Sequence, residues 1–482
     1  MNNSQSLQYF VPEILLFLTG IIALSMTFSQ NKKNSRTPAR ISLIGYFCTF
    51  IVLIFSTNQP IHGLFFNLTA YDPFSIFFKL IIIIFAIFIS LLFIRYPSND
   101  IKASPEYFFL MSMLVFGAFL TVSANHLLII FISLEIIGFI SFVLVGFENS
   151  KSPIVLKKYL PNLIASVIML YGLSFLYGLT GSLTLTEIGQ ALKNNLNSIY
   201  PVILIFLFFI FGLGSKITVA PFHFWSVDIY RKIPASISAL IMIIPKICGF
   251  ALLSRFIVIG LNNSHFPIIS KIDLKIFLAI LSVITITFGN LFAANQKKIS
   301  GILAYSMIAH SGFILLGFAT LNRQGMAASV YYLITYCIAL LGLLSIKSYL
   351  NNPKPIPNIK VPSRDSLFSK LAFIIFFLSL IGIPPLAGFM GKFSLIKILL
   401  EIKSNFYIIA FIAILNWAFM FFYYSKFLIH FLNSKTSFLS IEFKNKLHIT
   451  ILIILLSCLL FFGVFWRILY DLIQNSLYFF HI

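Results

Sequence analysis

Residues 126–147, HLLIIFISLEIIGFISFVLVGF, place one carboxyl group, that of Glu135, in the middle of an otherwise almost wholly apolar run. A helix needs about 20 such residues to cross the hydrocarbon core of a bilayer. A run of this length that is apolar on all sides indicates a transmembrane helix. The carboxyl group inside it needs a reason, because a charge at the membrane centre costs about 2.5–3.5 kcal/mol on insertion scales.

The composition of the chain excludes most other classes of protein. Of its 482 residues, 59% are hydrophobic, 17% are aromatic and 10% are charged, whereas about 25% of the residues of soluble domains are charged. A soluble fold, a disordered chain and a coiled coil are therefore excluded. A membrane barrel is excluded too, because its strands of about 10 residues alternate apolar and polar side chains. We expect an all-α polytopic membrane protein.

The chain contains about fourteen apolar segments that predict transmembrane helices. These segments are 9–29, 41–57, 73–94, 106–122, 125–147, 159–179, 199–230, 235–260, 273–294, 299–321, 325–349, 367–400, 404–431 and 447–475. Between them, 21 Lys and Arg lie in alternate loops and only 4 in the other set of loops and termini. Because loops on the cytoplasmic side carry the excess of positive charge, we expect both termini on the outer, periplasmic or intermembrane, side. The net charge of +21 is thus a topology signal and does not indicate nucleic-acid binding.

Two of these segments are longer than one span needs, and each is interrupted by Pro and Gly. The first carries Lys216 at the interruption and the second carries Lys392 just beyond it. Because the two lie five spans apart, they suggest a five-helix repeat whose second copy is inverted, which is a device of transporters. We expect one membrane domain, 1–482, with three N-terminal helices (1–105), a first repeat (106–260), a second, inverted repeat (273–431) and a C-terminal helix (447–475).

Four ionisable residues besides Glu135 lie near the middle of predicted spans or at their interruptions: Lys216, Lys246, His310 and Lys392. Desolvation favours the neutral form of a buried lysine and a nearby carboxylate favours the charged form, so such a lysine can exchange protons near neutral pH. An arginine cannot. The alternatives are fixed countercharges, snorkelling lysines, or groups hydrogen-bonded for packing. We expect these five side chains to form a polar axis that moves protons or another cation.

Other polar residues lie nearer the ends of the spans. Lys158 is a candidate site residue at the inner end of its span, with snorkelling as the alternative. His223, past the first interruption, is a candidate for proton uptake, and Asp228 is expected to hold the basic pair at 231–232. The remaining basic residues near span ends are expected to snorkel towards the headgroups. They are Lys79, Arg255, Lys275, Lys397, Lys426 and Arg467.

The sequence does not indicate a metal or redox site. The four cysteines lie in apolar segments and form no CxxC pair, so neither a disulfide nor a zinc or iron–sulfur site is predicted. The chain also has no GxxxxGK[ST] phosphate-binding loop. The polar axis therefore suits cation movement rather than electron transfer or ATP use.

Three stretches carry a resemblance to a known family: SKITVAPFHFWSVDIYRKIPASISALIMIIPKICGFALL (215–253), NQKKISGILAYSMIAHSGFILLGF (295–318) and IGIPPLAGFMGKFSLI (381–396). They resemble the antiporter-like subunit N of proton-pumping NADH–quinone oxidoreductase, respiratory complex I, which is subunit 2 in mitochondria. The resemblance runs from about residue 70 to 430. The PFHxW stretch alone marks only the wider antiporter-like superfamily.

The resemblance implies roles for six residues. Glu135 corresponds to a fifth-helix glutamate and Lys216 to a seventh-helix lysine, which form a pair in the family. The family's eighth-helix lysine, tenth-helix histidine, twelfth-helix lysine and sixth-helix lysine correspond to Lys246, His310, Lys392 and Lys158. A lysine at the twelfth-helix position resembles subunit N rather than its sister subunit M. Residues 226–234 depart from the family pattern.

The resemblance further implies a proton-translocating subunit of NADH:quinone oxidoreductase in a mitochondrial inner or bacterial plasma membrane. No cofactor is expected in this chain; NADH, FMN, iron–sulfur clusters and quinone would be bound by partner subunits, beside the sister antiporter-like subunits. Two alternatives stay open. One is a subunit of a multisubunit cation/proton antiporter, and the other is a stand-alone secondary transporter.

Overall fold

The structure, a computed structural model, is mostly helical. It describes residues 3–28, 37–57, 61–95, 104–148, 154–194, 200–223, 226–261, 268–350, 364–402, 406–433 and 446–478. The N-terminal half contains α1 (Asn3–Tyr9), α2 (Val11–Ser25), a 3₁₀ turn (Met26–Phe28), α3 (Thr37–Phe55), β1 (His62–Leu64), β2 (Thr69–Tyr71), α4 (Pro73–Arg95), α5 (Pro105–Ser123), α6 (Leu127–Glu148), α7 (Ile154–Thr180), α8 (Leu185–Asn194), α9 (Tyr200–Ile217) and α10 (Ser226–Lys232). The C-terminal half contains α11 (Ala235–Arg255), a π-helical turn (Phe256–Leu261), α12 (Ile268–Ala294), α13 (Ile299–Ala319), α14 (Arg323–Leu350), α15 (Arg364–Ile381), α16 (Ala387–Glu401), α17 (Tyr407–Asn433), α18 (Lys446–Val464) and α19 (Trp466–Tyr478).

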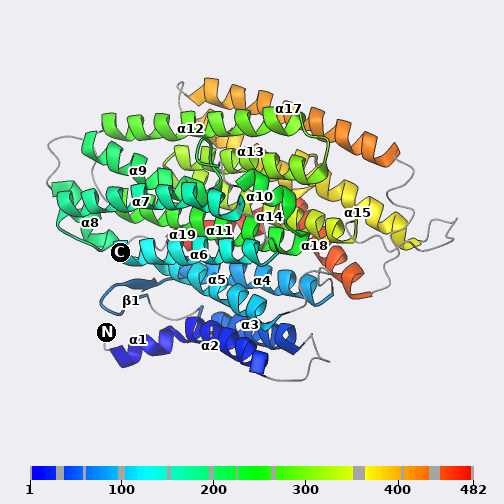
Figure 1. Ribbon diagram of the computed structural model, residues 1–482. Coiled ribbons are helices and arrows are strands. Elements are labelled where there is room, and N and C mark those ends of the chain that lie inside the picture. The colour runs from blue at the N-terminus through cyan, green and yellow to red at the C-terminus, as the bar shows by residue number, and fades with distance from the viewer. Residues whose placement is uncertain are drawn as a thin grey trace.

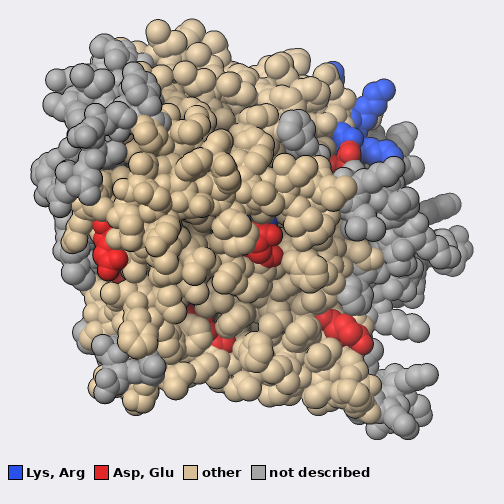
Figure 2. Space-filling view, turned by 60° about the vertical axis from the view of Figure 1, so that its left-hand side comes forward, with Lys and Arg blue, Asp and Glu red and all other residues tan. Residues whose placement is uncertain are grey.

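The long helices lie side by side in one bundle, with α2 and α3 at one edge and α12 and α17 at the opposite edge (Figure 1). Within the described residues, eleven helices are long and apolar enough to cross a membrane, or twelve if α18 and α19 together form one span. The surface seen in Figure 2 is almost wholly uncharged, and the Lys and Arg visible there gather at one edge. This is the surface expected of a helical membrane protein.

Both predicted helix interruptions are present. Helix α9 ends at Ile217 and α10 begins at Ser226, while α15 ends at Ile381 and α16 begins at Ala387. In each case the residue after the first helix has a positive φ, 59° at Thr218 and 86° at Gly382. A left-handed residue ends an α-helix, and glycine adopts it without steric cost.

The prediction of one continuous helix over 447–475 is wrong. The chain bends by 83° between α18 and α19, so only α18 continues the direction of a span. Helix α19 packs on α14 and α4, and the hydroxyl of Tyr470 donates to the carbonyl of Gln324. The short antiparallel hairpin β1–β2 and helix α8 were not predicted either, because both lie in loops between the predicted spans.

The interior of the bundle is formed by α11, α13 and α14. In the most apolar 18-residue stretch of α11 and of α14, all residues are buried, and in that of α13, 94% are. In α2, α7 and α17, only 33% of the residues of the corresponding stretch are buried. The helices with partly exposed faces therefore form the rim. Lys246 and His310 lie on α11 and α13, so the fold itself places them at the centre.

Glycine allows α12 and α13 to pack closely. A Cβ atom on Gly289 of α12 would collide with the backbone nitrogen and Cα of Ala309 on α13. A Cβ on Gly312 of α13 would likewise lie 2.8 Å from the backbone nitrogen of Ile286. Small residues at such contacts let the backbones of membrane helices approach. Because Ala309 precedes His310, this contact also fixes the position of the central histidine.

We predict that Gly289→Ala lowers the free energy of unfolding by about 1–3 kcal/mol, because the added methyl group must push two backbones apart. The matched control is Gly178→Ala on the exposed side of α7, where a Cβ would meet nothing within 4 Å; there the same change should be neutral or slightly stabilising. Unfolding of the purified subunit in detergent measures both. Equal stability of Gly289→Ala and the unsubstituted protein would contradict the prediction.

Candidate functional site

The carboxyl group of Glu135 and the amine of Lys216 lie together between α6 and α9. Lys216 Nζ is 3.5 Å from Glu135 Oε1, and the Lys216 side chain is 3% exposed against 25% for that of Glu135. Among the described residues, neither of these two atoms has a partner within hydrogen-bonding geometry. The two groups thus form an ion pair that no direct hydrogen bond locks.

Lys246 lies deep inside α11, one residue after Pro245. Its amine donates to the backbone carbonyl of Met307 on α13 at 3.1 Å and lies 4.9 Å from the ring centroid of Tyr336. The residue is 1% exposed. A carbonyl and an aromatic face both stabilise an ammonium group without adding a negative charge.

His310 is fully buried and contacts two tyrosines. Its Nδ1 lies 2.7 Å from the hydroxyl of Tyr332, and its Nε2 lies 3.3 Å from the hydroxyl of Tyr424. A neutral imidazole donates with one ring nitrogen and accepts with the other, so a hydroxyl on each side suits it in either tautomer.

Lys392 is fully buried in the second turn of α16. Its amine donates to the carbonyls of Leu380 and Ile381 at 2.8 and 2.9 Å. These are the last carbonyls of α15, which has no further turn to bond them, and the C-terminal end of a helix carries a partial negative charge. The break between α15 and α16 therefore provides the site for the lysine. The ring of Phe313 lies 5.3 Å from the same amine.

One face of α13 connects these sites. Met307, His310 and Phe313 follow one another at three-residue spacing, which places them on the same side of the helix. Met307 contacts Lys246, His310 lies in the middle, and Phe313 contacts Lys392. The adjacent Ser311 also lies 3.1 Å, hydroxyl to hydroxyl, from Thr218 at the end of α9. Helix α13 thus spans the distance from the first helix break to the second.

Two other candidates are placed less fully. His223 is buried after the break in α9, with its ring 4.5 Å from that of Phe288. Lys158 lies in the first turns of α7, but its side chain is outside the described part of the structure. Near Asp228, the guanidinium of Arg231 donates to Oε1 of Gln296 at 2.5 Å. The described residues contain no group of three or more His, Cys, Asp or Glu side chains that could hold a metal ion.

The prediction that Lys79 and Arg255 snorkel is wrong. Lys79 Nζ lies 2.5 Å from Glu13 Oε1, and both side chains are at most 4% exposed. Arg255, which is completely buried, binds both carboxylate oxygens of Asp72 at 2.8 and 2.9 Å and the carbonyl of Val122 at 3.0 Å. The exposed Lys397, Lys426 and Arg467 agree with the prediction.

Neither of these acidic partners stands out in the sequence. Glu13 and Asp72 lie at the ends of apolar segments, where a carboxylate is normal, and Asp72 is 183 residues from its arginine. The tyrosines around His310 were missed for a related reason, since an aromatic residue in an apolar run is usually core packing. A search for carboxylates within one turn of a span end would have found both acids.

The chain is similar in sequence and in fold to known membrane proteins. A model of the family described as NADH:quinone oxidoreductase/Mrp antiporter, TM, matches residues 124–416. The NADH-quinone oxidoreductase subunit N 2 of Sorangium cellulosum is 32% identical over 455 residues, covering 89% of this chain and 88% of the relative. The protein of the same description from Chloroherpeton thalassium is 33% identical over 430 residues, covering 86% and 83%. A chain of respiratory complex I from Thermus thermophilus has the same fold, with a TM-score of 0.78 at 24% identity over 95% of this chain and 98% of that one.

We predict that Arg255→Leu destabilises the protein by about 3–5 kcal/mol, because it leaves the carboxylate of Asp72 buried without a partner. The double variant Asp72→Asn/Arg255→Leu removes that charge and should recover part of the loss. The control is Lys397→Ala, whose pair with Glu401 is more than half exposed and should change stability by less than about 1 kcal/mol. Thermal unfolding in detergent gives all three values. A double variant no more stable than Arg255→Leu would contradict the account.

Proposed function

The chain belongs to the NADH:quinone oxidoreductase/Mrp antiporter transmembrane family, and from this we propose that its buried side chains carry protons across the membrane. It is an integral membrane protein and a proton-translocating subunit of NADH–quinone oxidoreductase, respiratory complex I. The electron transfer from NADH to quinone belongs to the enzyme as a whole. In our proposal this subunit contributes proton movement and no redox centre.

One observation supports the proton route above the others. Four ionisable residues of the interior are at most 5% exposed: Lys216, Lys246, His310 and Lys392. Each costs several kcal/mol to bury, and among the described residues none of the four is fixed by a short ion pair such as those of Lys79 and Arg255. Each is stabilised by the carbonyls, rings, hydroxyls or single carboxylate described above, so each can exist with and without its proton.

The route follows the order of the contacts. The pair of Glu135 and Lys216 opens or closes, which changes how strongly Lys216 holds its proton. Lys216 passes the proton to Lys246. Pro245, the residue before Lys246, lines the same small cavity as Lys216. From Lys246 it passes along the α13 face through His310 to Lys392, and is released to the outer side. Electron transfer in the partner subunits drives the opening by changing the electrostatics along the membrane axis.

The topology we propose has fourteen spans with both termini outside. The eleven or twelve helices found by length and composition leave out α9 and α15, which are shorter apolar helices next to the breaks. If α18 with α19 counts as the twelfth span, and α9 and α15 each count with the helix across the break as one span, the total becomes fourteen. The left-handed residue at each break, Thr218 and Gly382, supports two inverted five-helix repeats, 106–260 and 273–431, within one membrane domain. Lys158 would supply protons from the inner side.

The partners we propose are the other membrane subunits of complex I, including the sister antiporter-like subunits, together with the lipid bilayer. NADH, FMN, iron–sulfur clusters and quinone would be bound by other subunits. The membrane would be a bacterial plasma membrane or the mitochondrial inner membrane. A second candidate function follows from the family description, which also includes Mrp antiporters. Sodium sensitivity of a strain lacking this chain would favour that function, and loss of NADH–quinone reductase activity would favour complex I.

We predict that Lys216→Met in the assembled enzyme lowers, by at least about tenfold, the number of protons that this subunit pumps per NADH oxidised. Methionine keeps the bulk of the side chain but cannot take a proton. The matched control is Lys397→Met, which removes an exposed lysine of the same size. Dye-quenching assays on membrane vesicles, with NADH oxidation followed in parallel, measure the ratio. Pumping at the unsubstituted ratio in Lys216→Met would refute the proposed route.

A further inference from the structure

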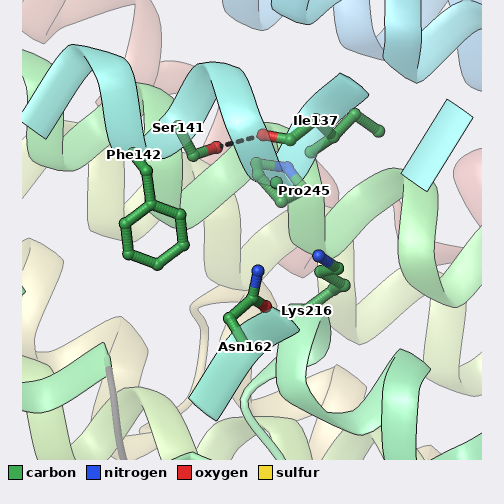
Figure 3. Close-up of a pocket in the computed structure, with 7 residues that line it drawn as sticks. Ile137, Ser141, Phe142, Asn162, Lys216 and Pro245 are labelled. Atoms are coloured by element: carbon green, nitrogen blue, oxygen red, sulfur yellow. Dashed lines mark hydrogen bonds between the residues drawn. The ribbon is translucent and has the colours of Figure 1, made fainter. Parts of the chain in front are cut away.

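A small cavity lies beside the Glu135–Lys216 pair. Its volume of about 10 Å³ is about the room that one water molecule needs. Gly138 and Ser141 of α6, Asn162 of α7 and Lys216 of α9 line it. Figure 3 shows the amine of Lys216 and the amide nitrogen of Asn162 pointing into the same space.

The two side-chain nitrogen atoms that face this cavity, those of Asn162 and Lys216, lack hydrogen-bond partners among the described residues. Asn162 is 1% exposed, and among the described residues its Nδ2 has no hydrogen-bond acceptor. Lys216 Nζ and Glu135 Oε1, which lie 3.5 Å apart, also lack a hydrogen-bond partner among the described residues. Leaving a buried donor without an acceptor is costly, because the hydrogen bond that it made to water is lost and not replaced. Two such donors at one cavity, with Glu135 Oε1 next to one of them, indicate a missing partner rather than separate defects.

The cavity exists because residue 138 has no side chain. A Cβ atom on Gly138 would lie 2.5 Å from Lys216 Nζ and 3.4 Å from Asn162 Nδ2. Any other residue there would press on the amine and fill part of the space. The other end of the Asn162 amide is held, because Oδ1 lies 3.3 Å from the hydroxyl of Ser215. The oxygen of the amide is therefore held in place, and its nitrogen is free to bond a molecule in the cavity.

We propose that this cavity binds one water molecule and that Asn162 is the positioning residue that holds it against the Glu135–Lys216 pair. The inference rests on the proposed function, to which it adds a site and a residue. The water accepts hydrogen bonds from Asn162 Nδ2 and Lys216 Nζ. It can donate to the hydroxyl oxygen of Ser141, whose own proton goes to the carbonyl of Ile137 at 2.6 Å.

The water gives the pair a way to exchange a proton without direct contact. Its second hydrogen is available to the Glu135 carboxylate. When Glu135 is protonated and Lys216 is neutral, Glu135 gives its proton to the water as the water gives one to the amine. One O–H bond of the carboxyl group breaks, one N–H bond forms, and the water is unchanged. The distance of 3.5 Å between Lys216 Nζ and Glu135 Oε1 is then no obstacle to proton transfer, because a water-mediated hydrogen bond is nearly as good as a direct one.

The test uses the whole enzyme in membrane vesicles. Asn162→Leu keeps the size of the side chain but offers no donor, and we expect it to slow coupled proton pumping by up to about tenfold, the factor that one buried hydrogen bond is worth. The matched control is Ser166→Ala, a buried residue one turn further along α7 that does not line the cavity and bonds only the carbonyl of Asn162. It should pump normally. Ser141→Ala, a smaller change that folds more easily, should slow pumping severalfold.

A second readout does not depend on pumping activity. An electron cryo-microscopy map of the enzyme that resolves other buried waters should show density within hydrogen-bonding distance of both Asn162 and Lys216, and Asn162→Leu should remove it. An empty cavity in the unsubstituted enzyme, or normal pumping in both Asn162→Leu and Ser141→Ala, would overturn the inference. Lys216→Met, run beside them, separates the two claims: if it fails to pump while both Asn162→Leu and Ser141→Ala pump normally, only the water site is refuted.

Discussion

The structure depends on the cost of keeping charged groups away from water. Lys216, Lys246, Lys392 and Arg255 are all buried in the bundle, and none could stay there without partners supplied by the protein. The helix breaks, the α13 face and the N-terminal hairpin all provide such partners. Much of what is unusual in this fold, from the interruption between α15 and α16 to the small residues between α12 and α13, serves to place a charge or its partner.

The buried charges fall into two classes that differ in how tightly they are held. Arg255 makes three short contacts with Asp72 and Val122, and an arginine does not lose its proton in a protein. That arrangement is a fixed clamp between α11, α5 and the end of the hairpin. Lys216 is held loosely at 3.5 Å from its carboxylate. Lys246 and Lys392 bond to neutral carbonyls. Lysines held in this way keep both protonation states within reach.

The features that could be predicted from the sequence are those that are unusual for a transmembrane helix. A carboxylate in mid-span, lysines beside Pro or Gly, and two segments too long for one span are each visible without a structure. The sequence could not predict partners that tertiary packing supplies. Asp72 meets Arg255 across 183 residues, the tyrosines around His310 resemble ordinary core, and the amide of Asn162 matters only because Gly138 lies opposite it. The bend between α18 and α19 was hidden because the apolar pattern continues through it.

The central claim is that protons pass through one connected set of buried groups, with His310 at its middle. The most direct measurement is the number of protons pumped per NADH oxidised by vesicles that carry His310→Phe, which keeps a ring in place but removes both ring nitrogens. His430→Phe, at an exposed histidine near the end of α17, is the control. The account predicts that the ratio falls for His310→Phe and stays constant for the control. An unchanged ratio in an assembled His310→Phe enzyme would contradict it.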